Sequence, residues 1–266
     1  MPYADNDGVK IFYIQEGEGT PIILQHGLAG THLDWIRGAD YVGALRNKYH
    51  VVALDARGRG KSDKLYAPEE HSMAHMVGDV TAVLDDLGLE KAHFWGYSMG
   101  GRVGLAAGVY APDRLSSLII GGAGLTERDS EDTIQICRNF RLEYEKRVPI
   151  YDRGIEAARA YLEETMDKDT APYMIDRWLN ADPRALIAYC SYQENIGLKE
   201  MVPSLNLPCL LYVGDKDTER YSRVIECAEI MQNAVFASFP GLDHGGAFRR
   251  IDIVLPQVLK FLDTLQ

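Results

Sequence analysis

Residues 92–102 constrain the fold of this chain more than any other stretch of the sequence. They pass from apolar residues through the pattern Gly-x-Ser-x-Gly, at Gly96, Ser98 and Gly100, into a run of small residues. A strand, a tight turn and a helix in this order predict a turn that holds Ser98 in a strained backbone conformation with an exposed hydroxyl. Only very small residues at Gly96 and Gly100 leave room for such a turn. The pattern alone is equally compatible with an ordinary strand-to-helix turn, because glycine and serine are common in loops.

Strand-like and helix-like segments alternate on both sides of this turn. Strands are expected at residues 9–14, 21–25, 49–54, 92–95, 115–120, 208–214 and 234–239. Helical spacing of apolar residues is found at residues 75–87, 222–233 and 251–265. Short apolar runs that alternate with helices predict βαβ units, and therefore an α/β fold with a mostly parallel, doubly wound sheet.

Residues 126–203 differ from the rest of the chain, because they are charged, helical in pattern and without a convincing strand. We therefore expect a core formed by residues 1–125 and 204–266, and a helical insertion formed by residues 126–203. Ligands of open α/β sheets bind at the carboxyl edge of the sheet. The insertion is expected at that edge, where it would act as a lid.

A serine hydroxyl is a poor nucleophile unless a base removes its proton. In chains with this turn the order is serine, then an acid, then histidine, and His244 alone among the seven histidines follows Ser98. The expected strand that ends at Gly214 leads into two candidate acids, Asp215 and Asp217. We favour Asp217, because the third position beyond the glycine lets a side chain turn back toward the base, and Asp215 stays open as the alternative. The acid would orient the imidazole and stabilise its charged form.

Acyl transfer also needs hydrogen-bond donors aimed at the developing oxyanion. The N–H of Met99, directly after the serine, is one candidate, and the N–H of Leu28 in a glycine-rich loop is the other. Gly27 and Gly30 would let that loop approach the serine closely.

Five short motifs of the chain, taken in their order and spacing, resemble those of the α/β-hydrolase fold superfamily. They are HGLAG at 26–30, DARGRGKS at 55–62, GYSMGG at 96–101, GDKD at 214–217 and GLDH at 241–244. The resemblance covers both ends of the chain, and the helical stretch between them matches nothing usable. Within the superfamily the chain is similar to the capped serine esterase, enol-lactonase and cofactor-free haloperoxidase-like branch. This resemblance implies an α/β-hydrolase fold with a helical cap.

Together these residues predict a serine hydrolase that cleaves a carboxylic ester or lactone through an acyl-enzyme, with a Ser98–Asp217–His244 triad and neither metal nor cofactor. Serine at the turn argues against haloalkane dehalogenases and epoxide hydrolases, whose nucleophile in this fold is a carboxylate. A carbon–carbon bond hydrolase or a cofactor-free perhydrolase of the same fold remains an alternative. The former usually has an aromatic residue after the histidine, where this chain has Gly245 and Gly246. A receptor for a small molecule that retains the triad is an alternative from a different class.

The sequence constrains the acyl group of the substrate less than it constrains the reaction. Several large apolar side chains are candidates for the lining of an acyl pocket: Trp35, Tyr97, Leu125, Tyr144, Met174, Trp178 and Phe248. No cluster of basic residues suggests a strongly anionic substrate, so we expect a small or medium apolar acyl group. Asp55 and Arg57 are interpreted as parts of a structural turn.

Composition excludes several other classes of protein. The net charge of −11 argues against a nucleic-acid partner and against attraction to anionic membranes. The four cysteines have no metal-ligand spacing and are expected to be buried thiols in a reducing compartment. No apolar run approaches the roughly 20 residues that span a bilayer, and the first residues lack the pattern of a secretory signal. We therefore expect a cytoplasmic protein that acts on a small molecule; the sequence does not decide whether it forms homo-oligomers.

Overall fold

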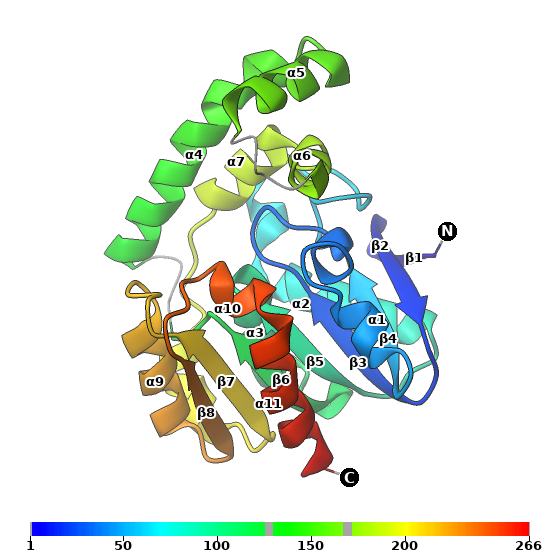
Figure 1. Ribbon diagram of the computed structural model, residues 1–266, viewed down its shortest axis with the longest axis vertical. Helices are drawn as coiled ribbons and strands as arrows, with labels where there is room; N and C mark the ends of the chain where they lie inside the picture. Colours follow the sequence, from blue (N-terminus) through cyan, green and yellow to red (C-terminus); the bar gives the residue numbers. More distant parts are fainter. Residues whose placement is uncertain (1, 126–129, 167–171, 266) are drawn as a thin grey trace.

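The computed structural model describes residues 2–125, 130–166 and 172–265 (Figure 1). In this described part, eight strands form one sheet in the order β1-β2-β4-β3-β5-β6-β7-β8. The strands are β1 Tyr3–Asn6, β2 Val9–Glu16, β3 Thr20–Gln25, β4 Tyr49–Leu54, β5 Ala92–Tyr97, β6 Leu115–Gly121, β7 Cys209–Gly214 and β8 Ala234–Phe239. Strand β2 pairs antiparallel with β1 and β4, and the other neighbouring strands are parallel. The predicted α/β fold with a mostly parallel sheet is confirmed.

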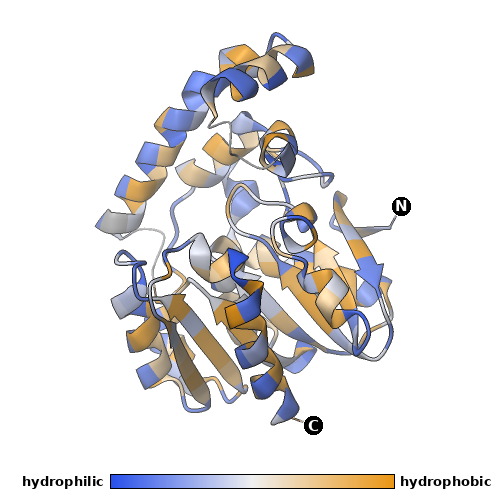
Figure 2. Ribbon diagram, viewed as in Figure 1, coloured by the Kyte–Doolittle hydropathy of each residue, from blue (hydrophilic) through white to orange (hydrophobic). Residues whose placement is uncertain are grey.

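Helices cover both faces of this sheet, and this explains the uninterrupted apolar character of its central strands. One face carries α2 Met73–Asp86, α3 Met99–Tyr110 and α9 Tyr221–Ile230; the other carries α1 Tyr41–Leu45 and α11 Ile251–Asp263. Successive side chains of β3 alternate between the two cores: Ile23 packs in the first, and Ile22 and Leu24 pack in the second. In Figure 2 the hydrophobic colours accordingly concentrate on the strands.

The hairpin formed by β1 and β2 was missed by the sequence interpretation. Its turn consists of Asp7 and Gly8, whose φ angles are 52° and 87°. Asn6 pairs with Val9 across this turn. An Asp-Gly pair between strand-like residues is a strong hairpin signal, so the sequence did contain the information.

The carboxyl ends of the central strands meet at one edge of the sheet. Gln25 at the end of β3 pairs with Leu54 of β4 and with Gly96 of β5. Tyr97 at the end of β5 pairs with Gly121 of β6. The loops that follow these strands therefore emerge side by side, although they are far apart in the sequence.

Between β6 and β7 the described residues contain helices and no strand. They are α4 Glu131–Tyr151, α5 Ile155–Thr165, α6 Pro172–Leu179, α7 Pro183–Ser191 and α8 Leu198–Met201, followed by the short 3₁₀ helix Val202–Ser204. Figure 1 shows α4 to α7, which we call the inserted helices, beyond the carboxyl edge of the sheet. The expected start of the insertion, residue 126, lies outside the described residues. Within the described ranges, no helix combines the length and the apolar character needed to cross a membrane.

Candidate active site

Ser98 occupies a sharp turn between β5 and α3. Its φ of 55° and ψ of −112° lie outside the regions that residues with a side chain normally adopt. A Cβ atom on Gly96 would lie 2.1 Å from the carbonyl oxygen of Gly100, and one on Gly100 would lie 2.2 Å from that of Gln25. Both distances are far below van der Waals contact, so any larger residue would displace the turn. The predicted strained turn with glycines on either side is confirmed.

Three side chains from separate loops form a hydrogen-bonded relay at this turn. Ser98 Oγ lies 3.1 Å from His244 Nε2, and His244 Nδ1 lies 2.6 Å from Asp217 Oδ2. Because a carboxylate can only accept, Nδ1 carries the proton and Nε2 is left to accept from the serine hydroxyl. Asp215, the alternative acid, instead accepts a hydrogen bond of 2.7 Å from the N–H of Gly241 and so fixes the histidine loop. The structure therefore brings Asp217, and not Asp215, to the imidazole.

The carboxyl group of Asp217 is held in its ionised form. Burial by itself would raise its pKa, but the hydrogen bond and charge of His244 and the guanidinium of Arg220 lower the pKa below its ordinary value. Arg220 Nη1 lies 3.0 Å from Asp217 Oδ1, the oxygen that His244 does not use. Both carboxylate oxygens thus have a donor.

Tyr97 fixes the backbone of His244. Its hydroxyl donates a hydrogen bond to the carbonyl oxygen of His244, and the two rings lie 5.2 Å apart. Burial raises the pKa of Tyr97 well above its ordinary value, so the hydroxyl remains a donor. Gly122, with φ of 58°, lies against both rings, because a Cβ there would be 2.9 Å from His244 Cε1 and 3.0 Å from the hydroxyl oxygen of Tyr97. The sequence predicted Tyr97 for the pocket but gave no sign of this second role, and it gave none for Gly122.

The glycine-rich loop after β3 lies against the serine. A Cβ atom on Gly27 would be 3.5 Å from Ser98 Cβ, and Gly27, Leu28 and Ser98 all line the same cavity. The carbonyl oxygen of Leu28 accepts a hydrogen bond of 3.0 Å from Nε of the buried Arg59. Met99 begins α3, where the first N–H groups have no carbonyl partner within the helix. Met99 thus directly follows Ser98, and the loop that contains Leu28 lies against it.

His26 supports this loop as a neutral ring. Its Nε2 accepts a hydrogen bond of 3.1 Å from the N–H of Ala56, and its Nδ1 lies 2.7 Å from the carbonyl oxygen of Gly27. Complete burial lowers the pKa of His26 to about 4, more than the nearby Asp55 raises it. The imidazole thus joins the loop after β3 to the loop after β4.

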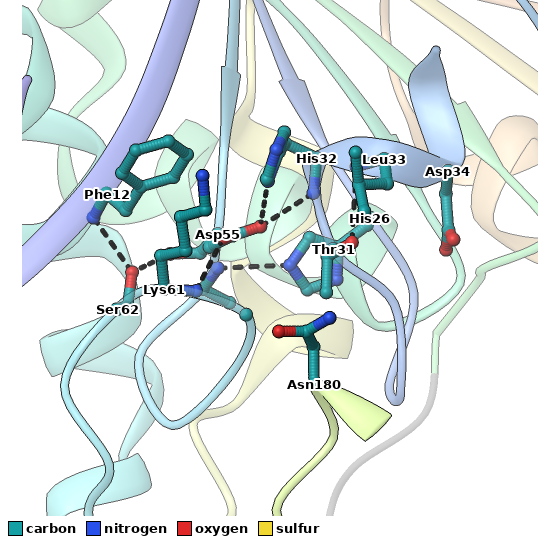
Figure 3. A network of polar contacts seen from close by, with 12 residues as sticks. Phe12, His26, Thr31, His32, Leu33, Asp34, Asp55, Lys61, Ser62 and Asn180 are labelled. Atoms are coloured by element: carbon teal, nitrogen blue, oxygen red, sulfur yellow. Dashed lines mark hydrogen bonds and ion pairs between the residues drawn. The ribbon is translucent and has the colours of Figure 1, made fainter. Parts of the chain in front are cut away.

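Asp55 organises the loop after β4 from within the protein (Figure 3). It is fully buried and accepts hydrogen bonds from the His32 N–H at 2.6 Å, from His32 Nδ1 at 2.9 Å and from the Lys61 N–H at 2.8 Å. Arg57, from the same loop, forms a buried ion pair of 2.6 Å with Asp79 of α2. Neither Asp55 nor Arg57 lines the cavity described next, which agrees with their interpretation as structural residues.

Ser98 and His244 line a cavity of about 380 Å³ that the inserted helices cover. This volume lies within the usual range of small-molecule sites. Of the residues predicted for the lining, five contribute to it: Tyr97, Tyr144, Met174, Trp178 and Phe248. The inserted helices add Tyr173 and Tyr189, which the sequence did not suggest.

For two residues, Trp35 and Leu125, the prediction that they line the cavity is wrong. Trp35 is fully buried, and its ring packs edge-on against Trp95 and Phe248 at 5.4 and 5.0 Å. Phe248 lines the cavity and Trp35 does not, so Trp35 supports the wall from behind. Leu125 is partly buried against the core and also contributes nothing to the lining.

The sequence shows no local cluster of basic residues, but the fold brings arginines from distant positions together at the cavity. Five arginines line the cavity, four of them from four different helices and one, Arg220, from the turn before α9: Arg102, Arg177, Arg220, Arg223 and Arg249. Two carboxylates accompany them. Asp34, in the 3₁₀ helix η1 His32–Trp35, forms an ion pair of 2.9 Å with Arg177 of α6, and burial raises its pKa despite that partner. Glu219 lies 3.3 Å from Arg220.

The described residues contain no group of three or more His, Cys, Asp or Glu side chains arranged to hold a metal ion. All four cysteines are free thiols; three are buried, and Cys137 is partly buried and lines the cavity.

Comparison with known proteins agrees with the architecture of the chain. Over nearly their full lengths, it is 24% identical to a non-heme haloperoxidase of Rhodococcus erythropolis (99% of this chain, 100% of that protein). A proposed carbamate hydrolase, RutD of Azorhizobium caulinodans, is 35% identical over 120 residues, which are 45% of this chain and 43% of RutD. The match to this curated relative thus covers less than half of its length.

A solved structure, the enol-lactonase of Burkholderia xenovorans, superposes with a TM-score of 0.78 at 23% identity, over 98% of this chain and 100% of that one. Identity this low shows a shared fold. A profile of the alpha/beta hydrolase fold matches residues 20–170, more than half of the sequence. The chain therefore belongs to the α/β hydrolase fold family.

Proposed function

We propose that this protein is a serine hydrolase that cleaves a carboxylic ester or lactone through an acyl-enzyme on Ser98. The observation that carries the proposal is the relay from Ser98 to His244 and Asp217, with separations of 3.1 and 2.6 Å. The serine and the histidine of this relay face a covered cavity large enough for a small substrate.

In the first step Ser98 Oγ attacks the carbonyl carbon of the ester, and His244 Nε2 takes the hydroxyl proton. Asp217 stays ionised and stabilises the imidazolium, for which its lowered pKa is suited. The bond to the leaving oxygen then breaks, and His244 returns its proton to that oxygen. For an ester this releases an alcohol; for a lactone the new hydroxyl stays attached to the acyl group.

The negative charge on the carbonyl oxygen needs preorganised donors. We assign these to the backbone N–H groups of Met99, which directly follows Ser98, and of Leu28, which lines the same cavity. One donor of this kind contributes about 3 kcal/mol to the transition state. The hydrogen bond from Arg59 to the Leu28 carbonyl supports the assignment, because it restrains the loop that would supply the second donor.

Water completes the cycle. His244 removes a proton from a water molecule as its oxygen attacks the acyl carbon, and Ser98 leaves with the proton returned to Oγ. The inserted helices would act as a lid that limits access of bulk water, and we propose residues 126–203 as this cap and residues 1–125 and 204–266 as the catalytic core. The ion pair between Arg177 and Asp34 supports a closed lid, since it joins α6 to the loop after β3.

The thiols of the chain favour a reducing compartment. All four are free, and one of them, Cys137, lines the cavity. Exposed to oxidising conditions, a thiol in that position would be open to modification. We therefore propose a cytoplasmic location.

The proposal is tested by Ser98→Ala with p-nitrophenyl acetate and butyrate as substrates. The variant should fold like the wild type, as judged by circular dichroism and thermal unfolding. Its kcat should fall by a factor on the order of 10⁵. Wild-type activity in a correctly folded variant would refute the mechanism.

A second reaction is favoured by one comparison. The haloperoxidase relative spans 99% of this chain, and its name includes the words non-heme. With the same acyl-enzyme, hydrogen peroxide in place of water would attack the acyl carbon and release a peracid. Bromination of monochlorodimedone, measured in acetate with peroxide and bromide, detects this reaction. If the wild type brominates no faster than Ser98→Ala, this reaction is excluded.

A further inference from the structure

The charge of the cavity is opposite to that of the protein. The chain carries a net charge of −11, yet five arginines and two carboxylates are found among the described residues of the lining. Clustered guanidinium groups in a concave, partly desolvated site produce a local positive potential. A site of this kind attracts an anion.

Two of the arginines have carboxylate partners within the protein. Arg177 is paired with Asp34 at 2.9 Å. Arg220 is paired with Asp217 at 3.0 Å and with Glu219 at 3.3 Å. Their charges are therefore largely compensated. Arg177 joins α6 to the loop after β3, and Arg220 holds the carboxylate of Asp217.

Arg249 differs from these two. It ends the short helix α10 Gly246–Arg249, five residues after His244, and it lines the same cavity as the imidazole. Within residues 2–125, 130–166 and 172–265 it forms no ion pair. Arg249 is an exposed residue that also lines the cavity, so its guanidinium is available to an anion that enters there.

Gly245 makes room for this guanidinium beside His244. The backbone of Gly245 has φ of −73° and ψ of −37°, which any residue can adopt, so its conformation does not require glycine. A Cβ atom there would meet Arg249 first, with Nη1 at 2.5 Å, Nη2 at 2.9 Å and Cζ at 3.1 Å. The absence of a side chain at position 245 thus has one evident steric consequence, the placement of the Arg249 guanidinium against the histidine loop.

We propose that Arg249 binds a carboxylate of the substrate, and that the preferred substrate is an ester or lactone that carries a free carboxylate in addition to the bond that is cleaved. This inference rests on the proposed function, since it assigns a substrate class to the same cavity. A guanidinium pairs with a carboxylate through two parallel hydrogen bonds, and this geometry would orient the substrate as well as hold it.

The test compares two series of p-nitrophenyl esters. One series consists of monoesters of linear dicarboxylic acids from succinic to suberic acid; in the other the distal carboxylate is capped as a methyl ester. At the best chain length, kcat/KM for the free carboxylate should exceed that for its capped partner by about tenfold, as expected for charge-assisted hydrogen bonding at a partly exposed site. The ratio should shrink as salt is added. Equal values, or a preference for the capped esters at every length, would overturn the proposal.

Variants locate the effect. Arg249→Gln should reduce the ratio between the two series to about one. Arg250→Gln is the matched control, because Arg250 has the same charge, pairs with Asp252 at 2.7 Å and is absent from the lining. The control should keep the wild-type ratio. Gly245→Ala retains the charge but displaces the guanidinium, and should lower the ratio as well. A ratio that is unchanged in Arg249→Gln, or lost equally in Arg250→Gln, contradicts the assignment.

A binding measurement separates this inference from the proposed hydrolysis. Adipate is titrated calorimetrically into the wild type and into Arg249→Gln. If neither ester series is hydrolysed but adipate binds the wild type about tenfold more tightly than the variant, the proposed reaction fails and the anion site stands. If the capped esters are hydrolysed while adipate binds both proteins equally weakly, the reaction stands and the anion site is refuted.

Discussion

The floor and the roof of the cavity are built in different ways. The floor consists of the strand-end loops with Ser98, Asp217 and His244, and each of these side chains is fixed by hydrogen bonds to residues of other loops. The roof consists of the inserted helices α4 to α7. It contacts the core through side chains, such as the Arg177–Asp34 ion pair and the Tyr189 ring, which lies 4.7 Å from the Arg59 guanidinium. We infer that the floor sets the reaction and holds the substrate carboxylate through Arg249, and that the roof shapes the space for the acyl chain.

The largest expected effect tests the floor. Asp217→Asn should lower kcat about 10⁴-fold, because the amide favours the wrong histidine tautomer and does not stabilise the imidazolium. Asp215→Asn is the matched control two residues away. It should stay within a few-fold of the wild type, because Asp215 bonds to the Gly241 N–H and not to His244. Steady-state kinetics on one p-nitrophenyl ester measures both. The reverse ranking of the two variants would show that the wrong acid has been assigned.

A smaller effect, on stability, also belongs to the floor. His26 has a pKa of about 4 when folded and an ordinary value near 6.5 when unfolded. Between these values the unfolded chain binds a proton that the folded protein excludes, so the free energy of unfolding falls as the pH is lowered. The loss between pH 7 and pH 4.5 should be about 2 to 3 kcal/mol from this residue.

Urea unfolding at the two pH values measures this loss in the wild type and in His26→Gln. The variant should be less stable at pH 7 but less sensitive to acid. His50→Gln serves as the control, because His50 lies at the surface and bonds with Gln15. An identical acid sensitivity of wild type and His26→Gln would mean that the buried imidazole is not the group responsible.

The smallest expected effect tests the roof. Trp178 of α6 lines the cavity, and the guanidinium of Arg147 lies 4.1 Å from its ring centre. Trp178→Ala should raise KM for longer acyl chains about tenfold through lost apolar contact, with kcat changed little. Ile155→Ala, an exposed position on α5, provides the control and should change neither. A hundredfold loss of kcat with constant KM in Trp178→Ala would contradict the division between floor and roof.

The same division explains how much could be predicted from the sequence. The floor is encoded in short motifs, because Gly96 and Gly100 flank Ser98 directly and the order of the chain left His244 as the one candidate base. The sheet followed from apolar runs of strand length. The choice between Asp215 and Asp217 was open in the sequence, and it depends on loop geometry that spacing alone does not determine.

The residues that line the rest of the cavity could not be predicted in the same way. Trp35 was expected in the lining because it is large and apolar, but Phe248, more than 200 positions later, lies between it and the cavity. The arginines of the lining are spread from position 102 to position 249, so no local cluster reveals them. Such features arise only when distant helices meet, and a single sequence contains no signal for that meeting.

Covalent trapping tests the central assignment most directly. The protein is incubated with diethyl p-nitrophenyl phosphate, which transfers a diethylphosphoryl group to an activated serine and releases one p-nitrophenol per site. Mass spectrometry of the intact chain and of its peptides should find a single added group, on the peptide with Ser98, and none in Ser98→Ala. Labelling of another nucleophile in the cavity, such as Cys137, or no labelling of a protein that hydrolyses esters, would contradict the assignment of Ser98 as the nucleophile.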